Sequence, residues 1–258
     1  SGPGDPGAGA ELPDPAMPDG VTDTPDAIPG DLSSDGIDVP ADGEVVEDPG
    51  SPPVPGFIAI DPTAVGTVRD MWAGGDDAIW AVVDVGLVLR WDGARLVPGP
   101  IPPTTKDLHE IDGLDDVRVV VGAEGTVLRL DGETWTALES PTDEDLYGVA
   151  LVSPSEFYAV GTGGTILHRK DDEWVTEHSG LTYQLHDVLV SPGGEVFIVG
   201  SFGTLLERSG PNWVQSQIAG PSPILRALWR APDGILFAVG TRGTVVVQDG
   251  ISWDLQVT

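Results

Sequence analysis

Residues able to do chemistry recur at one position of a repeated pattern. In each of five units, an apolar anchor is followed directly by a charged or hydrogen-bonding residue. These five residues are Arg69, His109, Tyr147, His186 and Arg226. Guanidinium, imidazole and phenol groups hydrogen-bond to carboxylates, phosphates and sugars. In a chain of formal net charge −30, this set predicts a binding site for such a group.

A second set comes from the tips of the turns in the same units. Glu124, Phe202 and Arg242 occupy equivalent turn positions and are expected to border the first set. An alternative reading of the first set stays open. Its members could instead pair with acids at the next position, namely Asp70, Glu110 and Asp187.

Catalytic and metal motifs are absent from the sequence. The four histidines are His109, His168, His178 and His186, and none forms a His-x-x-x-His or His-Glu-x-x-His pair. There is no Gly-x-Ser-x-Gly elbow, no phosphate-binding loop and no cysteine. We therefore expect no catalytic residue, no metal and no cofactor, although the many carboxylates leave a glycosidase pair open.

The elements that position these residues come from internal repeats. The second residues of five similar runs are Gly86, Gly125, Gly164, Gly203 and Gly243, spaced 39, 39, 39 and 40 residues apart. Ten residues after each lie Leu96, Trp135, Trp174, Trp213 and Trp253. About eighteen residues before each lie the anchors Val68, Leu108, Leu146, Leu185 and Leu225. Three anchors in one register indicate a repeat architecture.

Each unit is expected to form four short antiparallel strands joined by Gly-, Pro- and Asp-rich turns. Such repeats predict an all-β propeller of about five four-stranded blades, with the four tryptophans Trp135, Trp174, Trp213 and Trp253 packed between blades. In that fold, the first strand of each blade lines the central channel. The set Arg69, His109, Tyr147, His186 and Arg226, called the channel-mouth ring below, would then lie together at one end of the channel.

Composition divides the chain at residue 56. Residues 1–56 hold 12 prolines, 10 glycines, 13 acidic residues and no Lys or Arg, which predicts a disordered acidic linker. Residues 57–258 are expected to form the propeller. The acidity of both parts disfavours nucleic acid as a partner.

Closure of the propeller is left open by the sequence. Phe57 begins a strand-like run eleven residues before Val68, as Trp135 does before Leu146. This strand is surplus to five four-stranded blades. It either adds a fifth strand to one blade or offers an edge to another chain.

The repeats resemble a known group of proteins. Residues 71–82 (MWAGGDDAIWAV) and residues 158–168 (YAVGTGGTILH) are similar to the V-W-G…A-V-G-x-x-G-T-I-L repeats of exported, myxobacterial-type propeller proteins. More distantly, the chain resembles the photosystem II assembly factor and Asp-box propellers. The Asp-box itself is not met, because residues 131–135 (DGETW) are one residue too short, so no catalytic residue carries over.

These observations lead to an expected function and location. There is no apolar run long enough to span a membrane, and a Pro/Gly/Asp-rich segment before a folded domain is typical of exported lipoproteins. We expect an extracytoplasmic binding or scaffold propeller that recognises a protein or glycan. A lipid anchor before Ser1 stays open. The alternatives are a carbohydrate-active hydrolase or lyase, and a structural subunit that uses the spare edge strand.

Overall fold

The computed structural model describes residues 66–74, 78–220, 223–249 and 252–256. The linker predicted at residues 1–56 and the surplus strand predicted at Phe57 lie outside these ranges. The described residues belong to one compact unit, Phe57–Thr258. It is a propeller of five four-stranded antiparallel sheets, which confirms the predicted fold.

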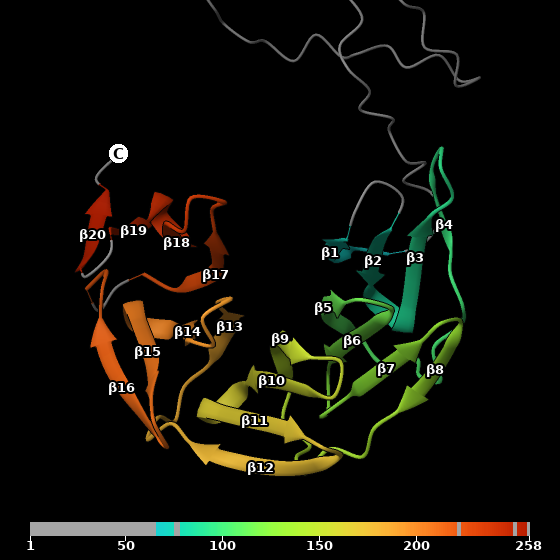
Figure 1. Ribbon diagram of the computed structural model, residues 1–258, viewed down its shortest axis with the longest axis horizontal. Coiled ribbons are helices and arrows are strands. Elements are labelled where there is room, and N and C mark those ends of the chain that lie inside the picture. Colours follow the sequence, from blue (N-terminus) through green and yellow to red (C-terminus); the bar gives the residue numbers. More distant parts are fainter. Residues whose placement is uncertain (1–65, 75–77, 221–222, 250–251, 257–258) are drawn as a thin grey trace, which may run out of the picture. The chain divides into compact units, whose positions relative to one another are not determined.

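Each blade takes four consecutive strands, and blade 1 begins with β1 (Figure 1). The first strands are β1 (Val68–Ala73), β5 (Leu108–Leu114), β9 (Leu146–Ser153), β13 (Leu185–Val190) and β17 (Leu225–Arg230). The second strands are β2 (Ile79–Val83), β6 (Val117–Gly122), β10 (Glu156–Gly161), β14 (Val196–Gly200) and β18 (Leu236–Gly240). The third strands are β3 (Leu87–Trp91), β7 (Val127–Asp131), β11 (Thr165–Lys170), β15 (Thr204–Ser209) and β19 (Val245–Asp249). The outer strands are β4 (Leu96–Pro98), β8 (Thr134–Ala137), β12 (Glu173–His178), β16 (Asn212–Gln217) and β20 (Ser252–Gln256).

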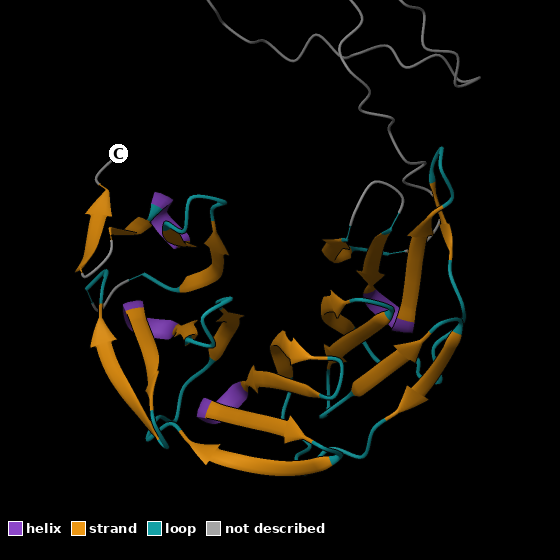
Figure 2. Ribbon diagram, viewed as in Figure 1, coloured by secondary structure: helices purple, strands orange, loops and turns teal. Residues whose placement is uncertain are grey.

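Four single-turn 3-10 helices join second to third strands, and Figure 2 shows them as the helical segments of the described chain. They are η1 (Asp84–Gly86), η2 (Thr162–Gly164), η3 (Ser201–Gly203) and η4 (Thr241–Gly243). Their middle residues have left-handed backbones, with φ of 61° at Val85 and 60° at Phe202. This conformation turns the chain sharply enough to start the next strand. In the described part of the chain, no helix is long and apolar enough to cross a membrane.

The core lies between blades. Residues paired across a sheet share one face, so each blade has a preceding face and a following face, named for the blade that each contacts. Between blades 2 and 3, Val119, Val121 and Val127 pack against Leu146 and Phe157. The predicted tryptophans Trp135, Trp174, Trp213 and Trp253 each pack into such a cluster, which confirms their inter-blade role.

Neighbouring blades contact each other in chain order through their first strands, from β1 with β5 to β13 with β17. Figure 1 shows these first strands around a common axis and the outer strands at the periphery. The same view shows an opening between blade 5 and blade 1. Within the described residues, the propeller is therefore an open ring, with blade 1 on one side of the opening and blade 5 on the other.

Candidate functional site

The five residues of the channel-mouth ring share a backbone feature that the sequence did not reveal. In every blade, the pairing between first and second strands shifts register at the ring residue. For example, Leu108 pairs with Gly122 and Glu110 with Val121, which leaves His109 between them without a partner. The same shift occurs around Arg69, Tyr147, His186 and Arg226. A β-bulge releases its extra residue from the sheet alternation and redirects the side chain.

Turns from each blade are attached to the same end of the first strand. The backbone N–H of Ala123 donates to the Asp107 carbonyl at 2.9 Å, and that of Thr162 donates to the Asp145 carbonyl at 2.9 Å. Equivalent bonds join Ser201 to Gln184 and Thr241 to Ile224. Glycine precedes each donor because little room remains there: a Cβ on Gly161 would lie 2.0 Å from the Asp145 oxygen. The turn tips and the ring residues therefore lie at one end of each blade.

Three ring residues from adjacent blades form an aromatic stack. The His109 and Tyr147 ring centroids lie 5.1 Å apart with an interplanar angle of 26°. Tyr147 and His186 follow at 5.8 Å and 39°. His109 Nδ1 lies 2.8 Å from the Leu146 carbonyl oxygen, which can only accept, so Nδ1 carries the proton. The stack gives this end of the channel a half-buried, amphipathic surface.

His186 stays neutral under physiological conditions because of its surroundings. Burial is the main cause, and the positive charge of Arg226 adds to it, so the pKa of His186 falls to about 4. Its Nε2 atom is buried and has no hydrogen-bond partner among the described residues. Arg226 itself is exposed at the next blade. The stack thus ends beside a cation, which is a suitable arrangement for a carboxylate or another anion.

Arg69 does not join this group. Its Nε donates to Oδ1 of Asp84 in the same blade, and this bond raises the pKa of Arg69 and lowers that of Asp84.

The turn tips differ from one another. Glu124 forms an ion pair with Lys106 at 3.1 Å, and the Phe202 ring packs edge-on against Tyr183 at 5.1 Å.

Arg242 is exposed at the tip of η4, as expected for a bordering residue. The structure therefore brings His109, Tyr147 and His186 together, with Arg226 close enough to act on His186. Arg69, on β1 of blade 1, bonds to Asp84 instead.

The acids that follow the ring residues do not pair with them. Asp70 Oδ2 accepts the N–H of Ile111 at 3.0 Å, Glu110 Oε2 that of Val149 at 3.2 Å, and Asp187 Oδ2 that of Leu228 at 2.6 Å. Each carboxyl group thus links the first strand of one blade to the first strand of the next. Among the described residues, no ring residue forms the ion pair considered from the sequence, and Arg69 pairs with Asp84 instead.

A fourth acid, Asp112, completes this inner belt of carboxyl groups by accepting the N–H of Leu151 at 2.7 Å. Burial raises the pKa of all four belt acids. The pKa of Asp187 reaches about 7, and that of Glu110 lies well above its usual range because burial and the neighbouring acids Asp187 and Asp70 act in the same direction. Raised pKa values reduce the negative charge directly behind the aromatic stack. The belt was missed from sequence because its partners are backbone groups about forty residues away.

One of the two histidines outside the ring, His168, belongs to an inter-blade network. His168 Nε2 lies 2.9 Å from Glu156, and its Nδ1 lies 3.3 Å from Glu177. Burial opposes a charge on His168, but the two glutamates outweigh it and raise the pKa. Arg208 pairs with Glu177 at 2.9 Å. Because each charge has a partner from the same or the next blade, the network stabilises the junction of blades 3 and 4.

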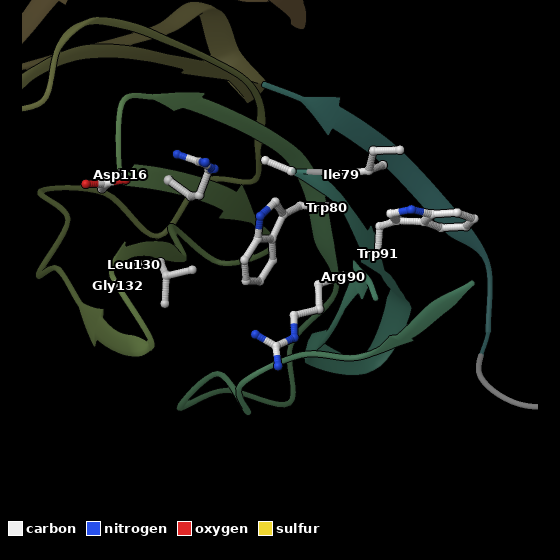
Figure 3. A pocket seen from close by; sticks show the side chains of 9 residues that line it. Ile79, Trp80, Arg90, Trp91, Asp116, Leu130 and Gly132 are labelled. Atoms are coloured by element: carbon white, nitrogen blue, oxygen red, sulfur yellow. The ribbon is translucent and has the colours of Figure 1, made fainter. Parts of the chain in front are cut away.

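A cavity of about 420 Å³ opens between blades 1 and 2. Figure 3 shows the Trp80 ring between Leu130 and Arg90, with Trp91 on the opposite side from Leu130. Arg90 pairs with Glu133 at 2.9 Å. Arg118 donates to two backbone carbonyls and lies over the Trp72 ring, 3.8 Å from its centroid. Both guanidinium groups are thus engaged, and polar side chains line the cavity together with Trp80 and Trp91.

No cluster of three or more His, Asp or Glu residues with metal-binding geometry occurs in the described ranges. The acids closest to the channel-mouth ring are engaged by backbone N–H groups. The stack and Arg226 therefore present hydrogen-bonding groups, aromatic rings and an exposed cation.

Comparisons with known proteins identify similar folds. No protein-family model matches the chain, and no curated protein matches it by sequence. Among solved structures, Ycf48 bound to D1 peptide aligns with a TM-score of 0.57 at 18% identity, over 74% of this chain and 66% of that one. The WD40 propeller domain of Doa1 aligns with a TM-score of 0.62 at 11% identity, over 71% and 64%.

A third similar structure is the computationally designed Ika8 protein, with a TM-score of 0.58 at 16% identity, over 73% of this chain and 60% of that one. The chain spans about two thirds or less of each of these proteins. At such identities, the comparisons show a β-propeller and leave the function to be argued from the site.

Proposed function

We propose that this chain is a non-catalytic, extracytoplasmic binding module that recognises a protein partner at the channel-mouth ring. The observation that carries the proposal is the stack of His109, Tyr147 and His186 ending at Arg226. All four side chains lie at bulges of the first strands, which turn them out of the alternation of the sheet while the sheets hold their backbone.

The chemistry of the site indicates what part of a partner binds. Arg226 supplies a charge for a carboxylate, Tyr147 supplies a ring and a hydroxyl, and neutral His186 supplies an uncharged imidazole. An extended peptide segment with an acidic or C-terminal carboxylate satisfies these groups together. Ycf48, a propeller of similar fold, is described in complex with a peptide, which supports this class of ligand.

The proposed extracytoplasmic location rests on the repeat pattern and on the composition of residues 1–56. Residues 71–82 and 158–168 resemble repeats of exported myxobacterial-type propeller proteins, and residues 1–56 have the composition of a linker. Both features favour a domain held away from an envelope surface. Secretion assays with the native gene, followed by fractionation of the envelope, would test this part separately.

The binding proposal is tested with purified protein on arrays of acidic peptides and of glycans. The strongest peptide is then titrated by calorimetry against wild type, Tyr147→Ala and Arg226→Ala. We expect at least a tenfold loss of affinity for each variant, as for an aromatic or Arg contact at a binding centre. Arg95→Ala is the matched control, because Arg95 is 75% exposed in a turn between β3 and β4.

Unchanged affinity in both variants, with folding intact by circular dichroism, would remove the ring from the site. A preference for glycans over all peptides, lost in the same variants, would keep the ring as the site but replace the protein partner with a sugar.

A further inference from the structure

Blade 5 presents an apolar sheet face on which no described element packs. Its following face carries Trp229, Phe237 and Val247 in one cross-strand row, and Val239 and Val245 in the next. Trp229 is 58% exposed and Val239 is 41% exposed. The equivalent of Val239 in blade 4 is Val199, which is fully buried against blade 5. The face of blade 5 therefore has inter-blade composition without a neighbouring blade.

Blade 1 shows the complementary exposure at the other side of the opening. Met71 lies on its preceding face and is 53% exposed, whereas the equivalent residues Ile111, Val149 and Val188 are at most 4% exposed. Val68, the anchor of blade 1, is 43% exposed, and the four other anchors are fully buried. Deeper on this face, a small cluster around Val83 and Leu89 is buried. The available part of the face is thus its inner edge, along β1.

We propose that a second copy of this chain docks across the opening, with the following face of blade 5 in one copy packed on the exposed inner edge of blade 1, along β1, in the other. Trp229 of one copy then covers Val68 and Met71 of its neighbour. An exposed apolar face with inter-blade composition is the kind of surface that marks a protein interface.

The contact is heterologous, since it joins two different surfaces. One copy uses blade 5 and the other uses blade 1, so a free face remains at each end of a pair. The proposal therefore predicts association that grows with concentration rather than a fixed symmetric dimer. It is independent of ligand binding at the channel-mouth ring.

The test is light scattering after size exclusion, and sedimentation velocity, on the full chain from micromolar to sub-millimolar concentration in physiological salt. Salt is needed because the chains carry a net charge of −30 each. Trp229→Glu and Met71→Glu should each weaken association at least 30-fold, which corresponds to about 2 kcal/mol. Val175→Glu is the control, because Val175 is 53% exposed on β12, away from the opening.

Mixing the two variants gives the decisive result. A Trp229→Glu chain keeps an intact blade 1 face, and a Met71→Glu chain keeps an intact blade 5 face. Their equimolar mixture should form a one-to-one dimer and nothing larger, whereas each variant alone stays monomeric. A wild type that is monomeric at every concentration overturns the proposal. Association that neither substitution weakens, or a mixture that stays monomeric, overturns it too.

Discussion

Replacing Asp187 by Asn should change how the stability of the propeller depends on pH. Asp187 is buried in the inner belt, where its Oδ2 accepts the N–H of Leu228 at 2.6 Å. Burial raises its pKa from 3.8 to about 7, partly offset by the N–H groups of Leu228 and Val188. An Asn side chain keeps an oxygen acceptor of similar size but cannot ionise.

The magnitude follows from the linkage between proton binding and folding. Between about pH 4 and pH 7, folded Asp187 holds a proton that the unfolded chain has lost. The free energy of unfolding therefore falls as pH rises, by ~1.4 kcal/mol per pH unit. Over about three units the sum is at most ~4 kcal/mol. The stabilisation is complete below pH 4 and is lost by pH 7.

His186 acts in the opposite direction over part of this range. Its folded pKa of about 4 lies below the usual 6.5, so stability rises with pH between these values. In the wild type, the pH dependences from Asp187 and His186 oppose each other. The free energy of unfolding can therefore look nearly independent of pH. The informative quantity is thus the difference in free energy of unfolding between wild type and Asp187→Asn.

The assay is urea unfolding of both proteins at one-unit intervals from about pH 4 to pH 9. We expect the free energy of unfolding of Asp187→Asn to rise relative to that of the wild type up to about pH 7. Above that pH the difference between the two proteins should stay constant. For His186→Gln, measured in the same way, the free energy of unfolding should instead fall relative to that of the wild type as the pH rises toward 6.5. A difference for Asp187→Asn that is constant across this range would refute the argument, because it would mean that folding leaves the ionisation of Asp187 unchanged.

Three further predictions concern the repeat itself. Val85→Gly should raise stability by about 0.5–1 kcal/mol in thermal unfolding, because a β-branched residue stands there at φ 61° while its side chain is 62% exposed; no change would mean that the turn is relaxed. Gly161→Ala should cost about 3 kcal/mol or more, since its Cβ would meet the Asp145 oxygen, whereas Gly132→Ala, with open space around it, should cost only ~1 kcal/mol. Equal losses in the two variants would contradict the steric argument. Trp135→Phe should cost about 1 kcal/mol by urea unfolding, through loss of the 3.0 Å bond from Nε1 to the Pro100 carbonyl, and an unchanged midpoint would show that this bond adds nothing.

The repeat spacing predicts most of the fold because each strand is specified locally. Anchors such as Leu146 and aromatics such as Trp174 occur at fixed offsets, and both are placed in the inter-blade core as predicted. The composition around Gly86 and Gly164 likewise predicts the turns that η1 and η2 form. Val83 replaces the glycine of the other units, yet the bond from Asp84 N–H to the Thr67 carbonyl still forms.

The candidate site is only partly predictable from the sequence. Alignment of the repeats picks out the five ring positions, but it treats them as equivalent. Whether Arg69 turns to Asp84 or toward the channel depends on which acid lies within reach in three dimensions. The opening could not be predicted for the same reason. Nothing in the local sequence pattern around Trp229 or Met71 says whether another blade covers these residues.

The bulge in every first strand has a consequence for how such a surface can change. Each blade contributes one side chain that takes no part in the ladder of cross-strand pairs, so cross-strand pairing places no constraint on its identity. Arginine, histidine and tyrosine already occupy this position in different blades of the same chain. Randomising these five codons alone would therefore give a combinatorial library in which the scaffold stays constant and specificity varies, one substitution per repeat.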